Sequence, residues 1–149
     1  MNVELSKITP PKKDNSGKIV QLTDATLRER REKILSAMKK ENLDTLIIYN
    51  DLEHGGNFSY LTGFVTRFEE GLLVLHQTGE AFLILGNENT KMVNYSRIPA
   101  TLIHTPFFSL PDQPMAGEKP LTEVFQEAGL HEESKVGLVG WKMFTGKSV

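Results

Sequence analysis

Apolar residues recur at helical spacing in the segment that follows Leu22. One face of the predicted helix carries the apolar side chains of Leu27, Ile34, Leu35 and Met38. Either Thr23 or Asp24 can cap its start, and Asn42 is a plausible stop, because short polar side chains satisfy the unpaired backbone groups at helix ends. The pattern predicts an amphipathic helix with one face against a core.

Runs of apolar residues further along the chain predict the strands of a sheet. Residues 43–49 are a largely apolar run that ends in four consecutive apolar positions, 46–49, which suits a strand covered on both faces. Residues 71–75 and 81–85 are apolar runs on either side of a Thr-Gly turn, and this order predicts a β-hairpin. Two further strands are expected over residues 101–104 and 135–140.

Other segments predict two more helices and two irregular stretches. A second helix is expected from Asn87 or Asn89 to about Arg97. A third has Pro120 in its first turn and Gly129 as its stop, with inward side chains at Leu121, Val124, Phe125 and Ala128. Residues 109–120 read as a surface loop. Residues 1–22 read as an extended arm, in which Ile19, Val20 and Leu22 can lie as a short edge against the body. The alternation predicts the α/β class, a layered domain with a mixed β-sheet flanked by helices.

Composition narrows the classes of function. The 149 residues fit one domain, and a net charge of −2 gives no electrostatic reason to expect nucleic acid or an anionic membrane as partner. The absence of cysteine excludes disulfides, thiolate metal sites and thiol catalysis. No apolar run approaches the roughly 20 residues that cross a bilayer, and the first residues lack the apolar core of a signal peptide. A cytoplasmic location is therefore expected.

The segment from Asn57 to Phe64 lies between the first strand and the hairpin. Tyr60 and Phe64 are four residues apart, so on a helical turn both rings would face the core. Gly63 would then supply a positive φ where the turn ends. A packed turn that positions a loop is favoured over direct catalysis by Tyr60 or Thr62, since neither has a partner base.

The loop that follows places a cation, a ring and two carboxylates immediately before a strand: Arg67, Phe68, Glu69 and Glu70. Binding residues concentrate on loops held by a rigid scaffold, so this loop is a candidate binding site. The alternative is a solvated turn with a surface ion pair, worth about 0–1 kcal/mol.

The four histidines are His54, His76, His104 and His131, and no two lie at helical metal-ligand spacing. A helix-based zinc site is therefore unsupported, and a structural or surface role is favoured for each. His54, beside Glu53 and a Gly-Gly pair, is the one in a loop that suggests a site. Asp44, Asp51 and Glu53 flank the first strand, but without further carboxylates or a basic surface they do not support a two-metal nuclease.

Gly146-Lys147-Ser148 superficially matches the end of a phosphate-binding loop. That pattern needs a glycine five residues before Gly146, where this chain has Trp141, and a helix directly after it. A phosphate site is therefore not predicted.

The sequence Asn42-Leu43-Asp44-Thr45-Leu46-Ile47-Ile48 and the motif Asn57-x-x-Tyr60-Leu61-Thr62-Gly63-Phe64, followed by a hairpin, resemble the N-terminal domain of the creatinase, prolidase and aminopeptidase P metallopeptidase family. The resemblance covers about residues 25–140. It implies a mixed sheet with helices, of ribonuclease H-like motif, in which Asn57, Tyr60, Leu61, Thr62, Gly63 and Phe64 are structural.

The same resemblance implies a division of labour between two domains. The N-terminal domain would hold no catalytic residue and no metal ligand, would support a homodimer and would wall the active site of a neighbouring subunit. His54, Arg67, Phe68 and Glu69 would then lie near substrate. A separate C-terminal domain of pita-bread fold would hold a divalent metal pair, Mn²⁺, Co²⁺ or Zn²⁺, through two Asp, one His and two Glu.

These expectations make residues 1–24 an arm and residues 25–149 a domain that continues into a catalytic domain in the full-length protein. The expected function is the non-catalytic N-terminal domain of a metal-dependent Xaa-Pro peptidase-like hydrolase, with no activity alone. The alternative is a free-standing interaction or small-ligand-binding domain of the same fold. An autonomous enzyme is least favoured, because the spacing assembles no nucleophile–base pair or metal cluster.

Overall fold

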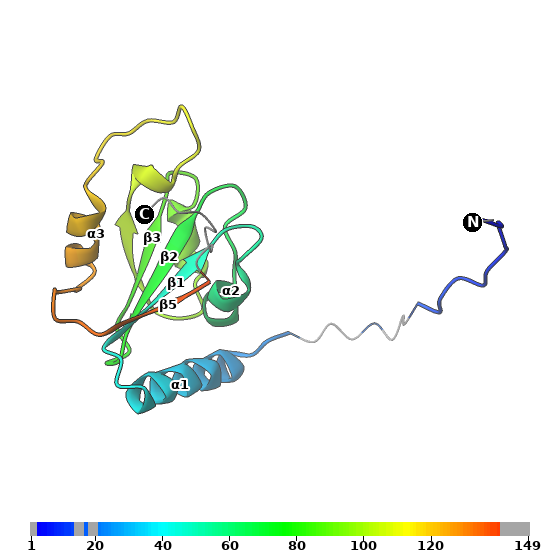
Figure 1. The fold of residues 1–149 in the computed structure, drawn as a ribbon, viewed down its shortest axis with the longest axis horizontal. Coiled ribbons are helices and arrows are strands. Elements are labelled where there is room, and N and C mark those ends of the chain that lie inside the picture. Colours follow the sequence, from blue (N-terminus) through cyan, green and yellow to red (C-terminus); the bar gives the residue numbers. More distant parts are fainter. Residues whose placement is uncertain (1–2, 14–16, 18–20, 141–149) are drawn as a thin grey trace.

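A mixed five-stranded sheet forms the centre of the computed structural model, which describes residues 3–13, 17 and 21–140 (Figure 1). Its strands, in spatial order, are β4 (Thr101–His104), β3 (Ala81–Leu85), β2 (Gly71–His76), β1 (Thr45–Asn50) and β5 (Val136–Val139). The three central strands pair antiparallel, whereas β5 joins β1 and β4 joins β3 in parallel. The α/β layered class and the mixed sheet predicted from the sequence are therefore confirmed.

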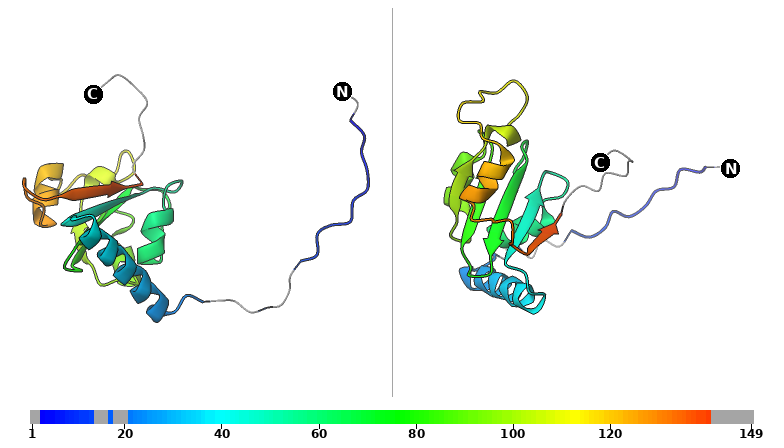
Figure 2. Two further views of the ribbon diagram at one scale, coloured as in Figure 1. Left: turned by 60° about the horizontal axis from the view of Figure 1, so that its bottom comes forward. Right: turned by 60° about the vertical axis from the view of Figure 1, so that its left-hand side comes forward.

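Helices cover both faces of this sheet (Figure 2). On one face α1 (Asp24–Lys40), α2 (Gly56–Thr62) and the 3₁₀ helix η1 (Thr90–Tyr95) pack on alternate residues of the strands. On the other face lie α3 (Leu121–Glu127) and the short η2 (Pro106–Phe108). All six residues of β1 are buried, as its consecutive apolar residues 46–49 predict for a strand covered on both sides.

The ends of α1 follow from local chemistry. The Thr23 hydroxyl accepts from the Thr26 backbone N–H at 3.2 Å, which satisfies one of the unpaired donors of the first turn. Beyond Lys40 the chain leaves the helix through Asn42, whose φ of +56° is a left-handed conformation that asparagine tolerates. The cap residue Thr23 and the stop residue Asn42, both considered from the sequence, therefore lie at the two ends of α1.

The second predicted helix differs from expectation. It is a six-residue 3₁₀ helix, and its preceding residue Asn89 makes no capping bond. The Asn89 side chain instead donates to the carboxylate of Glu69. Asn89, which the sequence suggested as a cap, is therefore engaged in a long-range contact. The third helix matches more closely: Val124 and Ala128 are fully buried and Gly129 follows with φ +80°.

The two irregular stretches predicted from the sequence agree with the structure only in part. Residues 109–120 form the predicted loop, most of which is exposed. Leu22 is also exposed, so it does not lie against the body as an edge. Ile19, Val20 and residues 141–149, with the Gly146-Lys147-Ser148 segment, lie outside the described residues.

Candidate functional site

Two loops meet at one end of the sheet because β1 and β2 are antiparallel. Asn50 is the last residue of β1 and pairs with Gly71, the first residue of β2. The loop after β1 and the loop before β2 therefore lie side by side. Between residues 51–53 of the first and residues 67–70 of the second is a cleft of about 340 Å³.

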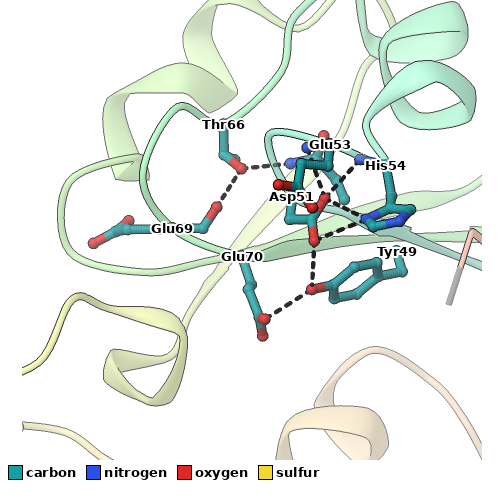
Figure 3. Close-up of polar contacts among 8 residues, drawn as sticks. Tyr49, Asp51, Glu53, His54, Thr66, Glu69 and Glu70 are labelled. Atoms are coloured by element: carbon teal, nitrogen blue, oxygen red, sulfur yellow. Dashed lines mark hydrogen bonds and ion pairs between the residues drawn. The ribbon is translucent and has the colours of Figure 1, made fainter. Parts of the chain in front are cut away.

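Asp51 organises the first loop and orients His54 (Figure 3). Its Oδ1 accepts from the backbone N–H groups of Glu53 and His54, at 2.9 and 2.6 Å. The imidazole Nδ1 of His54 lies 2.8 Å from the same oxygen, so Nδ1 carries the hydrogen and donates to the carboxylate. In the neutral ring Nε2 is then left as an acceptor on a side chain that is 42% exposed. This is a pre-oriented imidazole on the loop whose residues 51–53 line the cleft.

Tyr49 connects the two loops through its hydroxyl. The oxygen lies 2.7 Å from Oε1 of Glu70 and 3.3 Å from Oδ2 of Asp51. Burial raises the pKa of the Tyr49 hydroxyl, and the neighbouring Glu70 and Asp51 carboxylates raise it further. The phenol is therefore a neutral donor that holds two carboxylates together.

A second polar chain fixes the loop before β2 to the sheet. The amide of the fully buried Asn50 donates to the Thr66 hydroxyl, and that hydroxyl donates to the Glu69 backbone carbonyl. Residues 66–69 are thereby closed into a tight turn anchored on β1. Sequence reasoning missed Tyr49, Asn50 and Thr66. The detectable signal was a run of polar residues directly after a buried strand.

Glu69 has a different position from the one expected of a substrate-facing residue. It is only 3% exposed, and Figure 3 shows its side chain pointing away from Asp51 and His54. Its carboxylate accepts from the backbone N–H groups of Glu88 and Asn89 and, at 2.8 Å, from the Asn89 side-chain amide. Glu69 therefore links the turn to the segment after β3.

Arg67 and Phe68 are left at the tip of the turn, facing solvent. Phe68 is 64% exposed, and the Arg67 guanidinium carbon lies 4.9 Å from the centre of its ring. Within the described residues Arg67 forms no salt bridge, so the surface ion pair considered from the sequence is replaced by a cation–π contact. A planar cation and a ring are thus presented together at the cleft.

The motif from Asn57 to Phe64 follows the first loop of the cleft, and its apolar residues pack into the core. α2 begins at Gly56, and its inward residues are Phe58, Leu61 and Thr62, all at most 1% exposed. Phe64 packs edge-on against Phe58 with ring centres 5.2 Å apart. Gly63 has a φ of +82°, as predicted.

Two outward residues complete the motif. The prediction that the Tyr60 ring faces the core is wrong: the residue is 40% exposed, and the Arg30 guanidinium lies 4.3 Å from its ring centre. Asn57 is exposed as well. Tyr60 and Phe64 do not share a helix face, because α2 ends at Thr62 and Phe64 lies beyond it.

The other histidines lie away from the cleft. Nδ1 of His76 is 2.9 Å from the Thr45 hydroxyl and its Nε2 is 2.6 Å from the Ala128 carbonyl, so both ring nitrogens are engaged. His104 lies 2.7 Å from Oδ1 of Asn87. Among the described residues no three His, Asp or Glu side chains are grouped so that they could hold a metal ion. None of the described helices is long and apolar enough to cross a membrane.

Comparison with known proteins gives a consistent picture. The family described as Creatinase/Prolidase N-terminal domain matches residues 30–141. A proline dipeptidase from Streptococcus agalactiae has the same fold with a TM-score of 0.50 and 13% identity, over 74% of this chain and 75% of that one.

Two longer solved chains are also similar. They are an Xaa-Pro dipeptidase from Bacillus anthracis (13% identity, 75% of this chain, 26% of that chain, TM-score 0.49) and the dipeptidase PepE from Mycobacterium ulcerans (17%, 57%, 24%, 0.44). The matched part spans about a quarter of each of these two chains. No curated protein matches the sequence.

Proposed function

The chain belongs to the creatinase/prolidase N-terminal domain family, and from this membership we propose that it is the non-catalytic N-terminal domain of a metal-dependent Xaa-Pro peptidase-like hydrolase. Residues 25–149 would form the domain and residues 1–24 an arm. The domain would pair with a second copy and wall the active site of a neighbouring subunit. Chemistry would be carried out by a separate C-terminal domain.

The observation that carries this proposal is the cleft between residues 51–53 and 67–70. Its polar base is held internally: Tyr49 bridges Asp51 and Glu70, and the Glu69 carboxylate is turned into the protein. Its rim carries the exposed Arg67 cation and Phe68 ring, and His54 follows the lining residue Glu53 in the chain. Binding residues concentrate on loops that a rigid scaffold positions, as this base positions the exposed residues of the rim.

Each rim residue has a role that its chemistry supports. Arg67 would contact the carboxylate of a peptide substrate, because a guanidinium binds carboxylates through paired N–H groups. Phe68 would pack on an apolar side chain or a proline ring. His54 would accept a hydrogen bond from a substrate N–H group through Nε2. Glu69 would position the turn and not touch substrate.

The metal pair is proposed for the separate catalytic domain, because the described residues of this chain offer no group of three ligands. The pair would be Mn²⁺, Co²⁺ or Zn²⁺. It would supply an activated water there, and this domain would supply binding and exclusion of solvent.

The first test is the mass of the native polypeptide, measured with an antibody against this domain. A product longer by a whole domain, on the order of 200 residues or more, is expected for the front half of a peptidase. A product of 16.7 kDa would instead support the free-standing binding domain.

The second test uses the longer chain. Arg67→Ala and Phe68→Ala should each raise KM for an Xaa-Pro dipeptide several-fold with a smaller change in kcat. Phe107→Ala is the matched control, because Phe107 is similarly exposed, at 57%, and lies outside the cleft. Unchanged kinetics in both rim variants would remove this turn from the substrate site.

A further inference from the structure

β3 and β4 are parallel neighbours, so the chain leaves both strands at the same edge of the sheet. Their last residues, Leu85 and His104, are register partners. After β3 the chain runs into η1, which packs on one face of the sheet, and after β4 it runs into η2, which packs on the other face. A crevice opens where neighbouring parallel strands send their connections to opposite faces, and ligands of α/β sheets bind in such crevices.

A cavity of about 520 Å³ lies at this place. Its volume is within the range of small-molecule sites. It is separate from the cleft of the proposed function, which is lined by residues 51–53 and 67–70. The polar residues that line the cavity come from both connections and from the end of β4: Asn87, Glu88, His104, Asp112 and Gln113.

Hydrogen bonds hold the two walls of this cavity in place. The Asn87 backbone N–H donates to the Ser109 hydroxyl at 2.9 Å, which ties the connection after β3 to the connection after β4. The backbone N–H of Glu88 donates to the buried Glu69 carboxylate at 3.0 Å. The walls are therefore in place without a ligand, so that binding loses little free energy to ordering them.

Each side-chain nitrogen that can donate a hydrogen bond into the cavity already has an acceptor in the protein. The Asn87 amide donates to the Pro114 carbonyl at 3.0 Å, so its Oδ1 is the atom that lies 2.7 Å from Nε2 of His104. Nε2 of His104 therefore carries the hydrogen and donates it to Asn87. The Gln113 amide donates to Oε1 of Glu88 at 2.8 Å.

The lining atoms that have no partner within the described residues are acceptors. Oε1 of Gln113 is buried and accepts no hydrogen bond. Asp112 is exposed, and its carboxylate forms no ion pair with a described residue. In the neutral ring of His104, Nδ1 is left as an acceptor. The described residues that line the cavity include no lysine or arginine, so its charge is that of the Glu88 and Asp112 carboxylates.

We propose that this cavity binds a small organic dication of the diamine class, with two primary ammonium groups. One ammonium group binds the carboxylate of Glu88 on the connection after β3, and the other binds the carboxylate of Asp112 on the connection after β4. Ammonium groups supply the N–H donors that the unpaired acceptors need, and their hydrogen bonds to carboxylates are charge-assisted and therefore strong. The inference goes beyond the proposed function and does not depend on the peptidase assignment.

A divalent metal ion fits this cavity less well than a diamine. A metal ion needs several oxygen or nitrogen ligands around one point. Among the described residues no three His, Asp or Glu side chains converge in this way. A dication whose two charges are separated by a carbon chain does not need that convergence, because each charge meets one carboxylate on its own wall.

An NMR titration of the 149-residue chain with putrescine, a linear diamine, tests the site. Saturable shifts of the backbone amide signals are expected at residues 87–88, 104 and 112–113. Butylamine, with one ammonium group, should bind about tenfold more weakly at the same ionic strength. The fully N-methylated diamine keeps both charges but has no N–H donor, and it should be weaker as well. Equal affinity for either compound overturns the proposal. Shifts centred on the cleft at residues 51–53 and 67–70 also overturn it.

Substitutions that remove one charge at a time give the second readout. Glu88→Gln and Asp112→Asn keep the shape of each side chain, and asparagine tolerates the φ of +65° at position 112. Each should weaken putrescine binding about tenfold. Glu118→Gln is the matched control, because Glu118 is an exposed acid on the same loop that does not line the cavity.

Circular dichroism checks that each variant is folded. Unchanged affinity in both lining variants, or an equal loss in the control, overturns the diamine site. Neither outcome bears on the kinetics of Arg67→Ala and Phe68→Ala in the longer chain, so failure of this inference and failure of the proposed function are told apart.

Discussion

The carboxylate of Glu69 lies so close to Gly86 that a Cβ built on the glycine would stand 2.8 Å from Oε2. The same Cβ would come within 2.9 Å of the backbone of Phe108. The missing side chain at position 86 is therefore what lets a buried acid reach the N–H groups of Glu88 and Asn89. Through this contact the segment after β3 holds the turn that presents Arg67 and Phe68.

Gly86→Ala is expected to lower the free energy of unfolding by about 1–3 kcal/mol, because the new methyl group overpacks the site and displaces the Glu69 carboxylate. Gly56→Ala is the control, since a Cβ there meets nothing within 4 Å. It should be neutral or slightly stabilising, because it adds a better helix former to α2. Urea unfolding of the two variants makes the comparison. Equal stability in both would mean that the Glu69 contact is not tight.

Replacing two buried threonines, Thr66 and Thr105, with valine should change the free energy of unfolding differently. The Thr66 hydroxyl accepts from the Asn50 amide and donates to the Glu69 carbonyl, so Thr66→Val leaves a buried amide without its acceptor. A loss of about 1–3 kcal/mol is expected. The hydroxyl of Thr105 is buried and has no hydrogen-bond partner among the described residues. Thr105→Val should therefore be neutral or stabilising.

Thermal or urea unfolding would separate the two threonine variants. A loss of stability in Thr105→Val that equals the loss in Thr66→Val would contradict the assignment of the polar chain to Thr66. Because both substitutions exchange a hydroxyl for a methyl group of similar size, the difference between them reports the hydrogen bonds alone.

The sheet and the helices α1 and α3 could be predicted from the sequence because their signals are local. The continuous apolar run of β1 and the Thr-Gly turn of the hairpin each specify their element without help from distant residues. The candidate site could be predicted only in part. The sequence places Glu69 next to Arg67 and Phe68, but the partners of its carboxylate are about 20 residues away on another segment. Tyr60 was misplaced because α2 ends at Thr62, so the four-residue spacing to Phe64 does not bring the two rings onto one helix face.

Alanine substitutions at Gly63 and Gly117 distinguish the cost of backbone strain from the cost of steric crowding. Their φ angles are nearly equal, +82° and +84°, but a Cβ at Gly63 would lie 2.5 Å from Cγ of Arg97, and one at Gly117 meets nothing within 4 Å. Gly117→Ala should cost about 1–2 kcal/mol from the left-handed conformation alone. Gly63→Ala should cost roughly 1–3 kcal/mol more, because the Arg97 backbone is fixed by a hydrogen bond to the Thr62 carbonyl.

Chemical denaturation of both alanine variants would test this. Equal losses at the two positions would show that Arg97 moves aside freely. In that case the Tyr-Leu-Thr-Gly-Phe motif would need its glycine for the backbone conformation only.

Tyr49 predicts how stability depends on alkaline pH. Burial above all, with the Glu70 and Asp51 carboxylates, raises the pKa of its hydroxyl in the folded state above the value of about 10 in an unfolded chain. Between these two values the unfolded state has lost the proton and the folded state retains it. The free energy of unfolding therefore falls as pH rises through this window, and the contribution of Tyr49 is fully present below it.

Tyr49→Phe should be less stable than the native chain at neutral pH, by about 1 kcal/mol, because a donor to two carboxylates is lost. It should also show a shallower decline above about pH 10. Tyr95→Phe, at an exposed tyrosine, serves as the control for the substitution itself. Urea unfolding over a series of alkaline buffers gives the slopes, and a decline as steep in Tyr49→Phe as in the native chain would assign the alkaline loss to other groups.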